Sequence, residues 1–182
     1  MKKTLIIHPK DRSTDFLKPI YGKIENKTII TGGVSKTDII YEIINHDRIM
    51  MMGHGCPEGL FSVGQFGGFQ FSLIIDNDMS ELLKTKSDSV FIWCNADHYV
   101  RNNNLKGFFS GMFVSEVDEA YMFQLPAEKK LIDESNNRFS EILSNHIDKP
   151  SDIIYREVEK EYGELIKRNP IAEYNHQRLY FA

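Results

Sequence analysis

The sequence is poor in cysteine, and this scarcity excludes one class of protein. Only two cysteines occur among 182 residues, whereas small secreted scaffolds held together by disulfides carry many more. We therefore predict that Cys56 and Cys94 are free thiols. A disulfide between them is disfavoured in the reducing compartment that this composition indicates.

The chain also lacks long apolar runs and blocks of basic residues. No run approaches the roughly 18 apolar residues of a membrane span, and the N-terminal run from Leu5 to Ile7 is too short for a signal-peptide core. Acidic residues outnumber basic ones by 26 to 22, and Lys and Arg form no cluster of the kind that neutralises phosphates. We expect a cytoplasmic protein that binds neither nucleic acid nor membrane.

What the chain does contain is the composition of a globular protein. Hydrophobic residues make up 41% and charged residues 26% of the sequence, well away from the composition of disordered chains. The length suits one domain of roughly 100 to 200 residues. We predict a single domain over residues 1–182, with a core of about residues 1–125 and a C-terminal helical part of about residues 127–182.

Short β-branched runs alternate with helical patterns, which is typical of a parallel sheet with crossover helices. The prediction is an α/β fold in three layers, with a mainly parallel sheet, helices on both faces and two C-terminal helices. A segment with four glycines and four phenylalanines, residues 59–71, indicates a hairpin or a Gly-rich loop, and residues 101–104 read as a solvated loop. The expected strands are 4–8, 27–31, 48–52, 89–94 and 112–115, and the expected helices are 16–24, 35–46, 72–84, 132–147 and 150–166.

Reactive side chains follow two of the predicted strands. In an open parallel sheet, the residues just past the carboxyl ends of the strands line the natural crevice. His54 and Cys56 follow the third strand, and Cys94, Asp97 and His98 follow the fourth. Neighbouring strands lie about 4.8 Å apart, so a His and a Cys there can meet, and this pair is the minimum apparatus for thiol nucleophilic catalysis.

The residues around these two strand ends resemble a known family. The segments Ile49-Met50-Met51-Met52-Gly53-His54-Gly55 and Val90-Phe91-Ile92-Trp93-Cys94 resemble the caspase-like cysteine peptidases, the group that includes caspases, metacaspases, clostripain and gingipains. In that group one apolar strand ends in His-Gly and the next ends in the nucleophilic Cys. The 40 residues from His54 to Cys94 suit the separation of about 50 residues noted for caspases.

The resemblance implies a cysteine endopeptidase that acts on a peptide or protein substrate without cofactor or metal. Cys94 would be the nucleophile, and His54 would be the acid/base that protonates the leaving amine. The N–H groups of Gly55 and of Cys94 itself would hold the oxyanion. Beside the resemblance, Asp97 and Glu116 are candidate acidic residues for recognising a basic P1 side chain.

Two alternatives stand beside this hypothesis. The first alternative is a catalytically inactive caspase-like binding or scaffold protein. Cys94 can pack as a small hydrophobic residue, and Trp93 and residues 95–97 depart from the family pattern. A zinc-binding α/β domain is the second, since His and Cys are the ligands of tetrahedral zinc. If Cys94 is the nucleophile, its thiol should have a lowered pKa and react faster than that of Cys56. The residues of the zinc alternative are His54, Cys56, Cys94 and His98.

Overall fold

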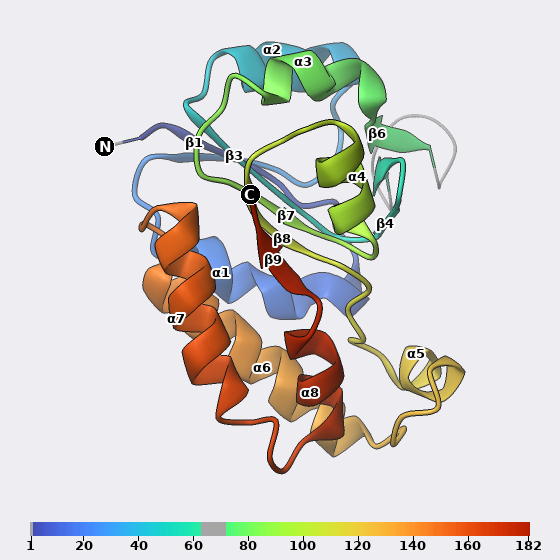
Figure 1. Ribbon diagram of the computed structural model, residues 1–182. Helices are drawn as coiled ribbons and strands as arrows, with labels where there is room; N and C mark the ends of the chain where they lie inside the picture. Colours follow the sequence, from blue (N-terminus) through green and yellow to red (C-terminus); the bar gives the residue numbers. More distant parts are fainter. Residues whose placement is uncertain (1, 63–71) are drawn as a thin grey trace.

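The computed structural model describes residues 2–62 and 72–182, which contain a six-stranded sheet and a smaller three-stranded sheet. The larger sheet is made of β1 (Thr4–Ile7), β2 (Lys27–Ile30), β3 (Arg48–Met52), β7 (Ser89–Ile92), β8 (Gly107–Ser110) and β9 (Leu179–Phe181). Its order is β2-β1-β3-β7-β8-β9 (Figure 1). The first five strands are parallel, and β9 pairs antiparallel with β8. The predicted α/β class and mainly parallel sheet are confirmed.

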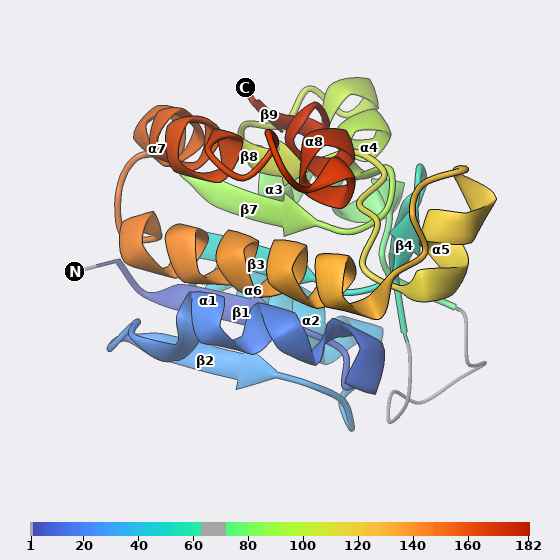
Figure 2. The ribbon, with the colours of Figure 1, turned by 90° about the horizontal axis from the view of Figure 1, so that it is seen from below.

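Helices cover the sheet on both sides (Figures 1 and 2). The helices α2, α3 and α4 pack on one face, whereas α1, α6, α7 and α8 pack on the other. Their bounds are η1 Arg12–Leu17, α1 Lys18–Gly22, α2 Lys36–Ile44, η2 Asn77–Met79, α3 Ser80–Leu83, α4 Ala96–Asn102, α5 Val117–Met122, α6 Lys129–His146, α7 Ser151–Gly163 and α8 Pro170–His176.

Strand β3 shows why its sequence is continuously apolar after the first residue. All five of its residues are buried, and successive side chains of a strand point to opposite faces. Met50 and Met52 belong to the hydrophobic core shared with α6 and α7, while Ile49 and Met51 belong to the core shared with α2 and α4. Coverage on both faces explains why every residue of β3 after the first is apolar.

Helix α2 begins where its sequence predicts. Ser35 and Asp38 form a capping box, in which the Asp38 carboxylate accepts the Ser35 N–H at 2.8 Å and satisfies a free donor at the helix start. Ile39 and Ile43 of α2 are buried, whereas Ile40 and Ile44 are exposed.

Three predicted elements are wrong in place or type. The fifth strand is β8, not residues 112–115, and it starts at Gly107, where a Cβ atom would lie 2.1 Å from the Ser89 carbonyl oxygen. The predicted helix 72–84 opens with strand β6 (Leu73–Ile75), and the helical part starts only after Asp76, which caps η2. The polar stretch after Cys94 forms α4, so the predicted loop at 101–104 starts inside a helix.

A small antiparallel sheet follows the His-Gly segment. It consists of β4 (Gly55–Cys56), β5 (Gly59–Phe61) and β6. The start of the predicted hairpin at 59–71 is therefore strand β5, and residues 63–71 lie outside the described part of the chain.

The C-terminal residues complete the fold where the sequence predicted only two helices. Phe139 of α6 and Val158 of α7 share one hydrophobic core with Ile6 and Met50 of the sheet. After α7, the helix α8 leads the chain back to the sheet, and β9 pairs with β8. The helical part is therefore built into the core that supports the sheet.

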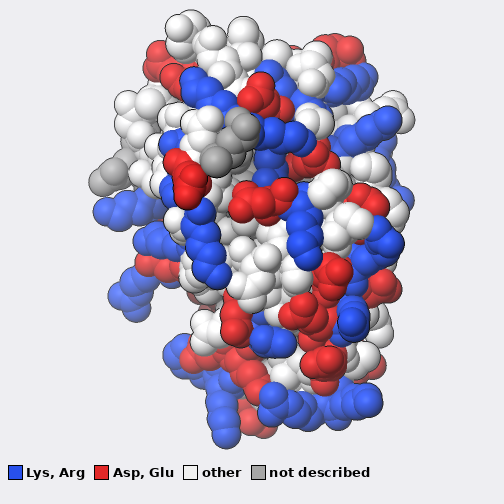
Figure 3. Space-filling model, turned by 90° about the vertical axis from the view of Figure 1, so that its left-hand side faces the viewer, with Lys and Arg blue, Asp and Glu red and all other residues white. Residues whose placement is uncertain are grey.

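The five parallel strands of the larger sheet point toward the end of the molecule where β4 and α5 lie (Figure 2). The opposite end, seen in Figure 3, carries basic and acidic side chains interspersed over its described residues. Within residues 2–62 and 72–182, no helix combines the length and the apolar character needed to cross a bilayer.

A buried histidine ties the end of β1 to the helices that follow it. His8 is 2% exposed, with Nδ1 2.9 Å from the Tyr21 hydroxyl and Nε2 3.1 Å from the Thr14 hydroxyl. Thr14 Oγ1 donates to the Asp11 carbonyl, so it accepts from His8, and Tyr21 donates to the other ring nitrogen. Burial, with a contribution from Lys18, lowers the pKa of His8 from 6.5 to about 4.

Neutral His8 should make the fold sensitive to acid. Because its folded-state pKa is depressed, its contribution to stability is complete above about pH 6.5 and is lost as the pH falls toward 4. When the pH is lowered from about 7.5 to about 5, this one group should reduce the free energy of unfolding by about 2 kcal/mol. Urea unfolding of the wild type and of His8→Gln at both pH values measures the difference. Equal pH dependence in the two proteins would contradict the assignment.

Candidate active site

The two strand ends predicted to carry chemistry are neighbours. Strands β3 and β7 pair in parallel, with Met52 opposite Ile92, and the Gly53 N–H donates to the Ile92 carbonyl at 3.0 Å. His54 and Cys94 each follow the last paired residue by two positions. The pairing therefore delivers the imidazole and the thiol to the same edge of the sheet.

His54 and Cys94 line one small cavity at this edge, together with Trp93, Phe113 and Glu119. Their side chains are not hydrogen-bonded to each other. The Cys94 sulfur lies 3.9 Å from the Phe113 carbonyl oxygen, to which it donates weakly, and the His54 side chain is 27% exposed. The structure thus brings the predicted dyad to one cavity, with the two reactive groups bound to other partners.

The partner of His54 is a serine on the segment after β1. Nε2 of His54 lies 2.7 Å from the Ser13 hydroxyl, which lies 2.7 Å from Oδ1 of Asp11. The same oxygen of Asp11 also accepts the Ser13 N–H at 2.8 Å, and it is 3.8 Å from the imidazole. Hydrogen bonds from Ser13, with the nearby imidazole, lower the pKa of Asp11. Ser13 and Asp11 are site residues that the sequence interpretation missed.

The Cys94 thiol is protonated in this environment. Burial, followed by the negative charge of Glu119, raises its pKa to about 12, because both factors disfavour the thiolate. The next residue, Asn95, adopts the left-handed conformation with φ of 66°. Asn tolerates this backbone better than most residues, and such sparsely populated conformations cluster at functional sites. The backbone therefore turns sharply directly after Cys94, between β7 and α4.

Trp93 explains why Gly occupies position 55. The indole is 2% exposed, and a Cβ atom on Gly55 would lie 2.2 Å from it. Nε1 of Trp93 donates to the Cys56 carbonyl at 3.1 Å, and this hydrogen bond links β4 to the end of β7. Gly55 therefore has a packing role beside the oxyanion role that the family resemblance implies.

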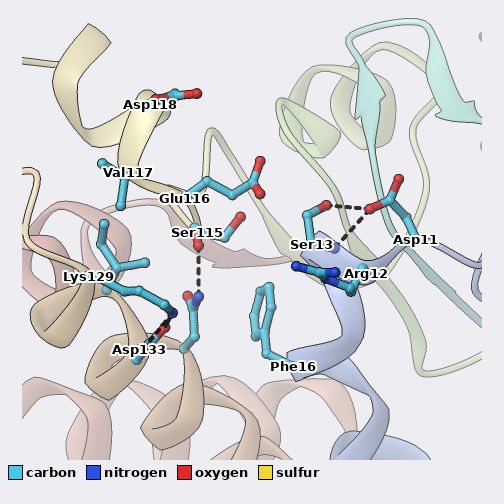
Figure 4. A pocket seen from close by; sticks show the side chains of 12 residues that line it. Asp11, Arg12, Ser13, Phe16, Ser115, Glu116, Val117, Asp118, Lys129 and Asp133 are labelled. Atoms are coloured by element: carbon cyan, nitrogen blue, oxygen red, sulfur yellow. Dashed lines mark hydrogen bonds and ion pairs between the residues drawn. The ribbon is translucent and has the colours of Figure 1, made fainter.

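Glu116 lies at the rim of a larger groove next to the cavity (Figure 4). The groove has a volume of about 600 Å³, and Phe16 and Ser115 line both spaces. Burial and then the charge of Glu119 raise the pKa of Glu116, while His54 lowers it. Glu116 is thus close enough to the dyad to interact with it electrostatically.

The other predicted residues lie apart from the cavity. Asp97 lies beside Gly111 and lines neither space. His98 is exposed, and the pKa of Cys56 is raised by burial and by Glu58. Within the described residues, the group able to share a metal ion is His146, Glu157 and Glu161. Among these described residues, the four candidates of the zinc alternative do not form such a group, although His54 and Cys94 share the cavity.

No protein-family model, curated protein or solved structure matches this chain. The case for a function therefore rests on the geometry of the site.

The charge of Glu119 should control the reactivity of Cys94. Glu119→Gln keeps an oxygen for the Ser115 and Glu116 N–H groups that Glu119 now binds and removes the negative charge, so the pKa of Cys94 should fall. At about pH 8, we expect alkylation of Cys94 by iodoacetamide to become about two- to fivefold faster. Mass spectrometry follows both cysteines, and Cys56 is the internal control. An unchanged Cys94 rate, or an equal rise at both cysteines, would argue against this role.

Proposed function

We propose that the protein is a caspase-like cysteine peptidase with Cys94 as nucleophile and His54 as acid/base. The observation that carries the proposal is that parallel pairing of β3 with β7 leads both side chains into one cavity. Two further features support the proposal: the two strand ends resemble the family, and helices cover both faces of the sheet. We propose that these helices and the sheet form the three-layer arrangement that the resemblance implies. Catalytic contacts are often loose before substrate binds, which accommodates the separate partners of the two side chains.

The reaction follows from the protonation of the resting thiol. Because the pKa of Cys94 is raised, the sulfur must pass its proton to His54 as it attacks the peptide carbonyl carbon. The N–H groups of Gly55 and Cys94 are the candidate donors to the resulting oxyanion. When the carbon–nitrogen bond breaks, His54 returns the proton to the leaving amine. Water then hydrolyses the thioester, which releases the acid and restores the thiol.

The groove suits a cationic substrate side chain. Lys129 holds the Asp133 carboxylate at 2.7 Å, so Asp133 is already paired. The other carboxylates of the lining are on Asp11, Glu116 and Asp118, and Arg12 is the remaining basic residue of the lining. Figure 4 shows Glu116 and Asp11 on opposite sides of the opening. A Lys or Arg side chain at P1 would relieve the repulsion among these carboxylates.

A non-catalytic binding protein of the same fold is the second candidate. The raised pKa of Cys94 and the adjacent charge of Glu119 favour it, since an activated cysteine has a lowered pKa. The two candidates differ in whether the thiol reacts with a peptide carbonyl.

Cleavage of a peptide library decides between the candidates. We expect cleavage by the wild type, none by Cys94→Ala, and a loss of about a hundredfold or more in His54→Ala, because proton transfer by a positioned side chain contributes 10²–10⁴-fold. Cys56→Ala is the matched control and should cleave normally. Absence of cleavage by the wild type would favour the binding protein, and cleavage that survives Cys94→Ala would disprove the mechanism.

The acidic groove should set specificity. Glu116→Gln removes one charge at constant size, so kcat/KM for peptides with Arg or Lys at P1 should fall about tenfold, equivalent to about 1.4 kcal/mol. Peptides with a neutral P1 residue should change little. Asp97→Asn is the matched substitution at the other candidate. If it lowers cleavage after basic residues and Glu116→Gln does not, the assignment to Glu116 is wrong.

A further inference from the structure

The segment after β1 reaches the candidate active site and is held firmly there. Thr14 of η1 is bonded to buried His8, and Phe16 stacks on Phe113 with ring centroids 6.2 Å apart. Asp11 caps η1 by accepting the Ser13 N–H. The Ser13 hydroxyl is therefore presented to His54 from an anchored helix.

The Ser13 hydroxyl has two close neighbours but only one proton to donate. Asp11 is an ionised carboxylate, because its pKa is lowered, and an ionised carboxylate can only accept. The hydroxyl proton must therefore go to Asp11, at 2.7 Å. The contact of 2.7 Å between Ser13 and Nε2 of His54 then requires the imidazole to be the donor.

We infer that Ser13 and Asp11 are positioning residues that hold His54 in the tautomer with a proton on Nε2 and a free lone pair on Nδ1. Each proton in this chain has one acceptor: Nε2–H binds Ser13, and the Ser13 hydroxyl binds Asp11. Nδ1 is then the ring nitrogen able to accept the thiol proton during attack. When it does, Asp11, 3.8 Å from Nε2, is the nearby negative charge that stabilises the imidazolium.

The same geometry argues against Ser13 as a nucleophile. An attacking serine must donate its proton to the histidine, and in triads the carboxylate binds the histidine. Here the carboxylate binds the serine, so the hydroxyl proton points away from the base. The role of Ser13 is thus to orient His54.

The inference rests on the proposed function for its catalytic meaning, but its structural claim is testable without substrate. Long-range ¹H–¹⁵N correlation spectra of the His54 ring report the tautomer directly. When the ring is neutral, the wild type should show the Nε2–H form. Asp11→Ala frees the hydroxyl to donate to Nε2, so the Nδ1–H form should become populated, whereas Asp11→Asn keeps an acceptor and should preserve the wild-type spectrum.

Two further variants separate a tautomer effect from damage to η1. Asp15→Ala is the same substitution on the same helix, where Asp15 forms a surface ion pair with Lys18, and it should leave the His54 spectrum unchanged. Ser13→Ala keeps the Asp11 carboxylate but removes the bridging hydroxyl, so the preference for Nε2–H should weaken. An Nδ1–H wild type, or an unaltered spectrum in both Asp11→Ala and Ser13→Ala, would overturn the inference.

Kinetics then test its catalytic consequence. In Ser13→Ala, kcat should fall about tenfold or more with KM within about twofold, because a wrong tautomer impairs proton transfer and leaves binding intact. Ser13→Thr restores a hydroxyl and should recover kcat. If the expected tautomer is found without any peptide cleavage, the peptidase proposal is refuted and the role of Ser13 and Asp11 stands. If cleavage is found with the other tautomer, only the role of Ser13 and Asp11 is refuted.

Discussion

Parallel pairing of β3 with β7 is the constraint on which the site depends. The register that places Met52 opposite Ile92 also places the segments that follow β3 and β7 side by side. A shift of one residue would turn the side chain of His54 or Cys94 toward the opposite face. The apolar residues of both strands fix this register, because they are buried on both sides. Trp93 holds β4 next to the end of β7, since it packs against Gly55 and donates a hydrogen bond to the Cys56 carbonyl. Core packing and site geometry are thus set by the same residues.

The candidate site combines a reactive pair with an environment that restrains it. Burial and Glu119 keep the thiol protonated, while Ser13, which is bonded to Asp11, is hydrogen-bonded to the imidazole. In the proposed reaction, a peptide bound in the adjoining groove would have to bring a carbonyl group between the two side chains, because the cavity itself has a volume of about 20 Å³. Proton transfer coupled to attack would then replace the preformed thiolate of other thiol enzymes. The carboxylates of the groove would attract a cationic substrate, whereas the charge that disfavours the thiolate is that of Glu119 in the small cavity.

Local patterns predicted the parts of the fold that depend on local chemistry. The strands β1, β3 and β7 were predictable from buried apolar runs, and α2 from its capping box. Strand β8 was misplaced because it begins at a glycine packed against a neighbouring carbonyl, and β9 was missed because its pairing depends on the return of the chain after α8. In the site, strand ends pointed to His54 and Cys94. Ser13 and Asp11 were missed because the sequence does not reveal that β1 lies beside β3, although this order brings the end of β1 to the same crevice.

Covalent labelling with a peptidyl acyloxymethyl ketone that carries Arg at P1 tests the central claim most directly. This electrophile reacts with a cysteine only where a peptide can bind and the thiol can be activated. We expect a single adduct on Cys94, identified by mass spectrometry of the intact protein and its peptides, and loss of the adduct in His54→Ala. Labelling that is absent, that falls on Cys56, or that is unaffected by His54→Ala would contradict the account.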